Sequence, residues 1–316
     1  MKKRKRRIRP LRLLAVLMIP FLFIGIVFGT FYYISNYVID KEIIFIDDCV
    51  YDKERYIEFS LDLNSEYYLL SRNKSSDNYI VYASGEKERI YPASLTKLMT
   101  MYVVLNHSDD LNEMLKVSYK DLDGLIEANA SVLGLGVGDT ISIKNALYGL
   151  ILPSGADCAN LLRRYVESLG YNFITLMNDY AKELGMHDTH FSNTTGLYDD
   201  ENYTTLYDLN LLGHALLKNQ DAKDILETFY YEDDGYTFIS TARRYQNKFT
   251  LDNARIVGGK TGYTLESKLN YFAIIEEDNG QCSLLWLAKA DEKGEDLKNA
   301  HFEDALDILN TYFKED

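Results

Sequence analysis

The sequence contains few cysteines and histidines, the residues that form disulfides and zinc sites. It has three cysteines and five histidines among its 316 residues. Cys49, Cys158 and Cys282 are widely spaced and odd in number, so they predict neither a disulfide framework nor a paired-cysteine metal site, although one bridge is compatible with them. The histidines show no His-Glu-x-x-His or similar ligand spacing, which argues against a zinc enzyme.

Acidic residues outnumber basic ones after the first twelve residues. The formal net charge is −14, yet residues 2–12 carry eight Lys or Arg and no acid, so the rest of the chain carries −22 (−14 − 8). An acidic body of this kind does not attract nucleic acid, and no motif for reading DNA or RNA is present. We therefore expect no nucleic-acid partner.

A long uncharged stretch follows the basic block. Residues 13–34 carry no formal charge, and a helix of that length reaches roughly 33 Å, enough to cross the hydrocarbon core of a bilayer. Basic residues beside a span favour the cytoplasmic side of the membrane. We expect a basic cytoplasmic tail over residues 1–12, a single-pass transmembrane signal anchor over residues 13–35, and an extracytoplasmic remainder.

Two alternatives exist for this stretch. A cleaved signal peptide requires small residues at its cleavage site, whereas the apolar run ends in the bulky Phe31, Tyr32 and Tyr33. A buried core helix would not be expected directly after a basic block. Residues 36–64 then form a stalk that leads to a domain over residues 65–316.

Strand patterns lie near both ends of this domain, and helical patterns lie between them and at the end of the chain. Strand-like runs occur at residues 67–70, 78–82, 271–275 and 283–288. Helical patterns occur at residues 91–105, 145–152, 156–169, 174–184 and 206–217, and within the last 20 residues. A sheet built from the two chain ends and flanked by helices follows, which is an α/β fold of the α+β type.

Ser94 and Lys97 are the first residues with a pattern typical of catalysis. On a helix, positions i and i+3 share a face. A serine hydroxyl needs a nearby base to act as a nucleophile, and lysine provides that base where burial lowers its pKa. A solvated lysine beside a small packing serine would also account for the pair, but the apolar residues around Lys97 argue against solvation.

Two further short motifs contain polar residues at predicted turns. Ser154 follows Pro153 at a corner between two helices, where it either caps the second helix or relays a proton. Lys260, Thr261 and Gly262 follow two more glycines. They form either a hairpin turn with an exposed lysine or a cationic, hydrogen-bonding seat for a carboxylate, which the glycines let approach closely.

Together and in this order, the three motifs resemble those of the serine penicillin-binding enzymes, most closely the D-alanyl-D-alanine carboxypeptidase family. The resemblance extends from about residue 65 to residue 290 and is strongest at residues 91–100, 147–155, 191–197 and 259–264. It implies a β-lactamase/transpeptidase-like fold, with a mainly antiparallel sheet flanked by helices and an all-helical subdomain.

The resemblance also implies an activity and a location. The substrate would be a peptidoglycan stem peptide ending in D-Ala-D-Ala, outside a bacterial cell membrane, and β-lactams would inhibit the enzyme. Ser94 would attack the peptide bond between the two D-alanines and form an acyl-enzyme. Lys97 would take the serine proton, and Ser154 would relay a proton to the departing D-alanine. No metal ion or organic cofactor would be needed.

The third motif is implied to bind the substrate. Lys260 and Thr261 would hold its free carboxylate. Gly262 would bring the backbone close, and the N–H groups of Ser94 and Tyr263 would form an oxyanion hole.

One position departs from the family pattern. The second motif usually ends in Asn, and here position 156 is Ala. Losing the hydrogen bonds of that Asn would cost about 1–3 kcal/mol, which affects the rate more than the type of reaction. Asp157 is interpreted as a helix-start residue and not as a replacement.

Two rival functions use the same residues. A β-lactamase needs a Glu-x-x-Leu-Asn segment, and residues 266–270 match it formally but lie after the third motif rather than before it. The match is therefore interpreted as chance. A domain that binds cell-wall peptide or penicillin with little or no turnover is the other rival, and Ala156 is its only support.

Overall fold

The computed structural model of the chain describes residues 45–46, 49–51, 61–74, 77–243, 253–291 and 299–314. The chain divides into two units after Phe45, and residues 46–316 form the second of them, which is compact. The transmembrane segment expected at residues 13–35 lies outside the described residues. Among those that are described, no helix is both long enough and apolar enough to cross a membrane.

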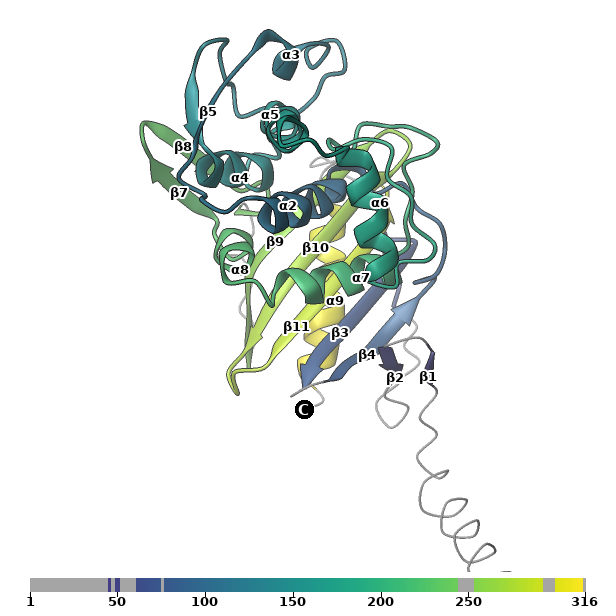
Figure 1. Cartoon of the computed structure of the whole chain (residues 1–316). Coiled ribbons are helices and arrows are strands. Elements are labelled where there is room, and N and C mark those ends of the chain that lie inside the picture. Colours follow the sequence, from purple (N-terminus) through teal and green to yellow (C-terminus); the bar gives the residue numbers. More distant parts are fainter. Residues whose placement is uncertain are drawn as a thin grey trace, which may run out of the picture. The chain divides into compact units, whose positions relative to one another are not determined.

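A seven-stranded sheet forms the centre of this unit (Figure 1). Its strands are β1 (Phe45–Ile46), β2 (Cys49–Tyr51), β3 (Tyr67–Lys74), β4 (Asp77–Ser84), β9 (Ala254–Thr264), β10 (Lys268–Glu277) and β11 (Cys282–Ala290). Their order is β1-β2-β4-β3-β11-β10-β9. From β4 to β9 the neighbours are antiparallel, and β2 pairs parallel to β4. Part of the segment expected to be a stalk, residues 36–64, therefore belongs to the sheet.

Both ends of the domain meet in this sheet, as the sequence predicts. Strand β3 pairs with β11, with Leu70 opposite Leu285. The prediction of a mixed fold with a mainly antiparallel sheet and flanking helices is confirmed. The strands are longer than expected, and Lys260 lies in the middle of β9 rather than in a hairpin turn.

Helices cover both faces of the sheet. They are α2 (Thr96–His107), α3 (Tyr119–Leu122), α4 (Ile143–Ile151), α5 (Ala156–Ser168), α6 (Phe173–Glu183), α7 (Leu206–Leu216), α8 (Gln220–Leu226) and α9 (Ala300–Lys314), with a 3₁₀ turn η2 (Ala93–Leu95) before α2. Helix α7 packs on β3 and β11, and α9 packs on β10 and β11. Figure 1 shows α7 and α9 on opposite faces of the sheet.

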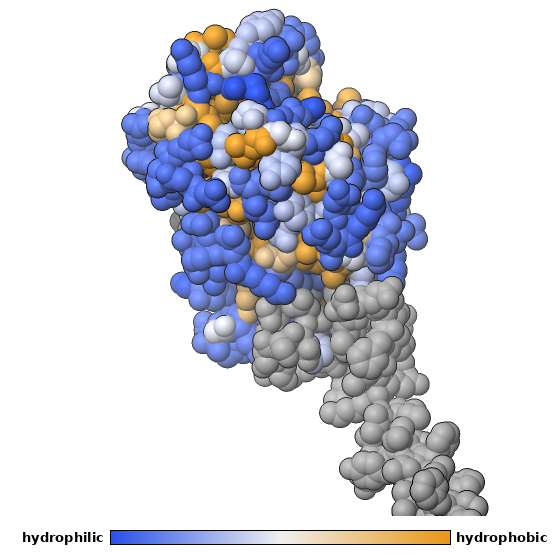
Figure 2. All heavy atoms as spheres, viewed as in Figure 1, coloured by the Kyte–Doolittle hydropathy of each residue, from blue (hydrophilic) through white to orange (hydrophobic). Residues whose placement is uncertain are grey.

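Strand β10 separates two apolar cores. Phe272 and Ile274 belong to the larger core, which contains the buried residues of α2 and α7. Tyr271 and Ile275 belong to a second core with α9. Successive residues of a strand point to opposite faces, so β10 is buried on both sides and its apolar run is continuous. The outer face in Figure 2 is mostly hydrophilic, with apolar residues in separate patches.

Helix α2 lies at the centre of the larger core, as its sequence predicts. It contacts α4, α5, α6, α7 and α8, which explains why it is apolar nearly all round. Its enclosure also fixes the position of η2 immediately before it. The residues that precede and begin α2 therefore have a rigid support.

The expected all-helical subdomain is wrong in one respect. The region around α3–α5 and α8 also contains two two-stranded ribbons, made of β5 (Met114–Lys116) with β6 (Thr140–Ser142) and β7 (Tyr230–Asp233) with β8 (Tyr236–Ile239). These strands have three or four residues each, too few for a period-2 pattern to show in the sequence.

Candidate active site

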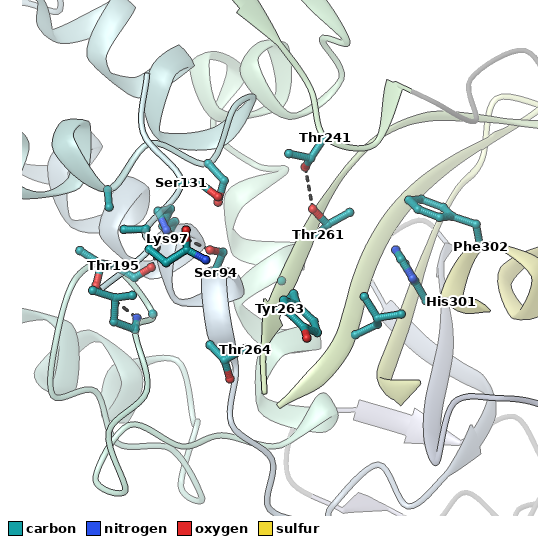
Figure 3. Close-up of a pocket in the computed structure, with 18 residues that line it drawn as sticks. Ser94, Lys97, Ser131, Thr195, Thr241, Thr261, Tyr263, Thr264, His301 and Phe302 are labelled. Atoms are coloured by element: carbon teal, nitrogen blue, oxygen red, sulfur yellow. Dashed lines mark hydrogen bonds between the residues drawn. The ribbon is translucent and has the colours of Figure 1, made fainter. Parts of the chain in front are cut away.

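A cavity of about 540 Å³ lies where η2, the beginning of α2, β9 and several loops meet (Figure 3). Six of the seven predicted site residues line it: Ser94, Lys97, Ser154, Thr261, Gly262 and Tyr263. The seventh, Lys260, lies directly behind Ser154. The remaining lining residues are 129–131, Ala156, 195–197, Thr241, Thr264, Leu269, His301 and Phe302. Segments far apart in the sequence therefore meet at one site.

Ser94 and Lys97 lie at the beginning of α2. Ser94 is the middle residue of η2, and Lys97 is the second residue of α2. Lys97 Nζ is 3.0 Å from Ser94 Oγ and also donates to the backbone oxygen of Thr195 at 2.5 Å. The positive end of the α2 dipole lies here and favours negative charge that develops at Ser94.

The side chain of Lys97 is only 2% exposed, so it is not a solvated lysine. Burial lowers the pKa of Lys97 to about 7, although the negative charge of Asp157 opposes this shift. A lysine with this pKa is partly unprotonated at neutral pH. It can therefore accept a proton from a neighbouring hydroxyl.

A tight loop holds the carbonyl group that Lys97 contacts. Asn193 Oδ1 accepts hydrogen bonds from the N–H groups of Thr195 and Gly196 at 3.1 and 2.7 Å. Gly196 has φ +78, and a Cβ there would lie 1.8 Å from the backbone oxygen of Ala93. Only glycine combines this φ with this approach, so the loop packs directly against η2.

Lys260 is enclosed behind the cavity wall. Its side chain is 0% exposed, and Nζ donates to Ser154 Oγ at 2.8 Å and to the backbone oxygen of Thr261 at 2.9 Å. Burial, followed by the nearby charge of Lys97, holds the pKa of Lys260 well below its usual range. Thr261 is therefore the residue of this pair that lines the cavity.

Ser154 does not cap a helix. The N-cap of α5 is Gly155, which makes no side-chain capping bond. Ser154 itself has φ +66, a left-handed conformation that costs a non-glycine residue on the order of 1–3 kcal/mol. Such strain is common at functional sites. Here it accompanies a hydroxyl that lines the cavity and accepts from Lys260.

Two threonine hydroxyls meet at the edge strand β9. Thr261 Oγ1 and Thr241 Oγ1 are 2.6 Å apart (Figure 3). Both residues line the cavity, and together they offer donors and acceptors to a ligand. Sequence reasoning missed Thr241 because no motif surrounds it.

Gly262 lets β9 pass close to the candidate nucleophile. A Cβ at this position would lie 3.0 Å from the oxygen of Pro92 and 3.2 Å from the nitrogen of Ser94. The backbone around Ser94 and the backbone of residues 262–263 are therefore adjacent. The two backbone segments that carry the expected oxyanion-hole N–H groups therefore lie side by side.

Asp157 stabilises a loop beside the site through hydrogen bonds. Its carboxylate is 1% exposed and accepts from the N–H groups of residues 133–135 at 2.9, 2.9 and 3.1 Å. The N–H of Ala156 donates to the oxygen of Ser131 at 2.8 Å. Asp157 is in the first turn of α5, as expected, but it also orders the segment that leads from residues 129–131.

The glutamate and asparagine of the rival segment do not line the cavity, although Leu269 of the same segment does. Glu266 is exposed in the turn between β9 and β10 and does not line the cavity. Asn270 of the same segment is buried, donates to the oxygen of Tyr91 at 2.9 Å and accepts from the N–H of Lys289 at 3.0 Å. Within the described residues, no group of three or more His, Cys, Asp or Glu is placed to hold a metal ion.

The arrangement of these groups suits nucleophilic catalysis by a serine. A half-buried serine lies beside a buried lysine of lowered pKa at the positive end of a helix, in a cavity with further hydroxyls. Such a site can form and hydrolyse an ester on the serine. On a mixed α/β fold with these three motifs, it defines a serine acyl-transfer protein of the penicillin-recognising class.

Comparisons with known proteins agree with this class. The pattern of the D-alanyl-D-alanine carboxypeptidase family matches residues 58–286. The D-alanyl-D-alanine carboxypeptidase DacF of Bacillus subtilis is 28% identical over 204 residues, which are 63% of this chain and 51% of that protein. DacC of Escherichia coli, of the same description, is 31% identical over 214 residues, 61% of this chain and 50% of the relative.

A solved structure extends the similarity to the fold. The crystal structure of the Streptomyces K15 DD-transpeptidase superposes with a TM-score of 0.70 at 25% identity and covers 81% of this chain and 100% of its own. The chain belongs to the D-alanyl-D-alanine carboxypeptidase family. It spans about half the length of the two curated relatives named above.

Proposed function

We propose that the protein is a serine D-alanyl-D-alanine carboxypeptidase that removes the terminal D-alanine from peptidoglycan stem peptides. The observation that carries the proposal is the 3.0 Å distance between Ser94 Oγ and the buried Lys97 Nζ in the cavity. The residue roles, the substrate and the membrane location are part of the same proposal.

The first half of the reaction forms an ester on Ser94. Lys97, unprotonated, takes the hydroxyl proton as Ser94 Oγ bonds to the carbonyl carbon between the two D-alanines. The N–H groups of Ser94 and Tyr263 stabilise the negative oxygen that develops. The C–N bond then breaks, and the proton passes from Lys97 through Ser154 to the nitrogen of the released D-alanine.

The second half restores the serine. A water molecule gives a proton to Lys97 and adds to the ester carbonyl. The bond to Ser94 Oγ breaks, and Oγ recovers a proton from Lys97. The products are the peptide shortened by one residue, with a new carboxylate, and the free enzyme. No oxidant, reductant or cofactor enters this balance.

The substrate carboxylate is recognised at β9. Thr261 and Thr241 offer hydroxyls 2.6 Å apart at the cavity wall. Gly262 allows the peptide to lie close to the strand. Lys260 does not touch the carboxylate. It supports this binding site from behind, through its hydrogen bond to Ser154.

One experiment separates this function from its rivals. The full-length chain and its Ser94→Ala variant are incubated with a labelled penicillin and with a peptide ending in D-Ala-D-Ala. Label on Ser94 with D-alanine release supports the carboxypeptidase. Label without release indicates a binding domain, and rapid penicillin turnover indicates a β-lactamase. Unchanged D-alanine release by Ser94→Ala would refute the proposal.

The same proposal includes the placement of the chain. Residues 13–35 anchor it in a bacterial cell membrane, with residues 1–12 in the cytoplasm and the catalytic domain outside. The support is the uncharged length of this segment after eight basic residues. Protease added to intact spheroplasts should degrade the domain and leave the N-terminal tail protected. Release of the domain by alkaline washing would contradict a membrane anchor.

A further inference from the structure

The cavity extends beyond β9 to the beginning of α9. His301 and Phe302 are the second and third residues of that helix, and both line the cavity. In Figure 3 the Thr241–Thr261 pair lies between Ser94 and these two rings. The cavity therefore has a distal end, formed by α9, past the hydroxyls that face the substrate.

The pairing of β9 with β10 also places Thr261 close to the beginning of α9. Thr261 of β9 pairs with Tyr271 of β10. The ring of Tyr271 is 5.6 Å from that of His301 and 4.6 Å from that of Phe302, measured between centroids. Only the ring of Tyr271 therefore separates the beginning of α9 from the position of Thr261 on β9.

His301 is a buried polar residue of the site whose two ring nitrogens have no hydrogen-bond partner among the described residues. It is 2% exposed. Burial lowers the pKa of His301 to about 3, so the imidazole is neutral and offers one donor and one acceptor. Buried polar groups are normally paired, so a ligand group in the cavity is the expected partner.

We propose that His301 hydrogen-bonds a polar side chain of the residue that the enzyme releases, and so determines which leaving residues longer than D-alanine are accepted. The inference rests on the proposed function, in which the substrate carboxylate lies at Thr241 and Thr261. The methyl group of D-alanine makes no hydrogen bond with His301. A side-chain amide presents one acceptor and N–H donors, which match a neutral imidazole.

The size of the cavity agrees with a longer leaving residue. Its volume of about 540 Å³ is within the roughly 300–1,000 Å³ of pockets that hold drug-sized ligands. Phe302 lines the same end and offers an apolar surface to the methylene groups of such a side chain. His301 is therefore a specificity-determining residue of the proposed reaction and not its acid or base.

The test compares two peptides that differ only in the last residue, D-Ala-D-Ala and D-Ala-D-Gln. For the full-length chain, kcat/KM is measured by release of the free D-amino acid, because this quantity reports the step that expels it. In His301→Phe the ratio of kcat/KM for D-glutamine to that for D-alanine should fall about tenfold, or about 1.4 kcal/mol. His301→Gln keeps a donor and an acceptor and should recover part of the ratio.

A matched control is His214→Gln. His214 is also a buried histidine, but it does not line the cavity and bonds Ser71. Its substitution should leave the ratio unchanged. Acylation of Ser94 by labelled penicillin reports whether each variant is folded, and His301→Leu replaces His301→Phe where that check fails.

The outcomes separate the two proposals. An unchanged ratio in both His301→Phe and His301→Leu, or a wild-type chain that releases D-alanine but no D-glutamine, would overturn the role of His301 and indicate that only water occupies the distal end. Failure of the wild-type chain to release D-alanine from the first peptide would instead overturn the proposed function.

Discussion

Lys260 Nζ donates a hydrogen bond to Ser154 Oγ at 2.8 Å, and neither side chain is more than 4% exposed. A buried amine thus lies directly behind a cavity-facing hydroxyl. It fixes the orientation of Ser154, whose backbone is held in a left-handed conformation. We infer that Lys260 acts on the substrate through Ser154 and Thr261.

Lys260→Met should slow catalysis and also lower the stability of the fold. The substitution removes the hydrogen bonds to Ser154 Oγ and to the Thr261 oxygen, and leaving a buried acceptor unpaired costs about 1–3 kcal/mol, so the rate of Ser94 acylation by penicillin should fall roughly 10- to 100-fold. The melting temperature should fall as well, because removing one partner of a buried polar contact leaves the other partner unpaired. Lys218→Met, at an exposed lysine, is the control. Unchanged acylation in Lys260→Met would show that Ser154 does not need its partner.

Acylation of Ser94 should depend on pH through Lys97. Burial lowers the pKa of Lys97 to about 7, and only the unprotonated amine accepts the serine proton. The acylation rate should therefore rise as pH increases from 6 to 8 and level off above. Stopped-flow measurements with a chromogenic β-lactam test this. A rate that is flat over this range would exclude Lys97 as the titrating base.

Asp157→Asn should move that pH profile. The charge of Asp157 raises the pKa of Lys97, so its removal should shift the midpoint of the profile to lower pH. The Asn side chain keeps only one acceptor oxygen for the N–H groups of residues 133–135, so stability should also fall. Asp121→Asn is the control, because Asp121 is equally buried but pairs with Arg164. It should lower stability and leave the midpoint unchanged, and a shift in both variants would contradict the assignment.

The sequence predicts those parts of the site that depend on local spacing. Ser94 and Lys97 are three residues apart on one helix, so their contact follows from helix geometry. The bond between Ser154 and Lys260 joins residues 106 positions apart, and only the tertiary arrangement of the α4–α5 corner and β9 reveals it. The left-handed conformation of Ser154 also goes beyond what the local sequence predicts, because Pro153 and Gly155 indicate a turn there but not this backbone conformation for the serine.

The other features of the site that the sequence does not predict also depend on tertiary contacts. The helical spacing of α9 predicts a packing helix, but which core it covers depends on the order of the strands. His301 and Phe302 therefore reach the cavity without any motif that marks them. The loop around Asn193 belongs to a stretch that resembles the family, residues 191–197. Its role, which is to position a backbone carbonyl that accepts a hydrogen bond from Lys97, becomes visible only in the folded structure.

Gly196→Ala should disable the site by displacing η2. The added Cβ would meet the oxygen of Ala93 at 1.8 Å, and a displacement of about 1 Å at reacting groups can cost roughly 100-fold in rate. Ser94 acylation should fall by about that factor. Gly170→Ala is the matched control, since Gly170 also has positive φ, at +97, but nothing lies within 4 Å of its Cβ position. It should lower the melting temperature and leave acylation intact, and equal acylation in both variants would disprove the steric argument.

Ala156→Asn should increase turnover. Ala156 lines the cavity and is 1% exposed, at the position where the family motif usually has Asn. An amide there would add a hydrogen bond to the substrate, and one such bond, about 1.4 kcal/mol, corresponds to roughly a tenfold rise in kcat/KM for D-alanine release. Ala156→Leu has nearly the same shape without the amide and is the control. A gain in Asn but not in Leu would show that the rate is limited by a missing polar contact. Equal rates in both would mean that this chain holds the substrate amide by other groups, of which residues 129–131 on the facing loop are the nearest candidates.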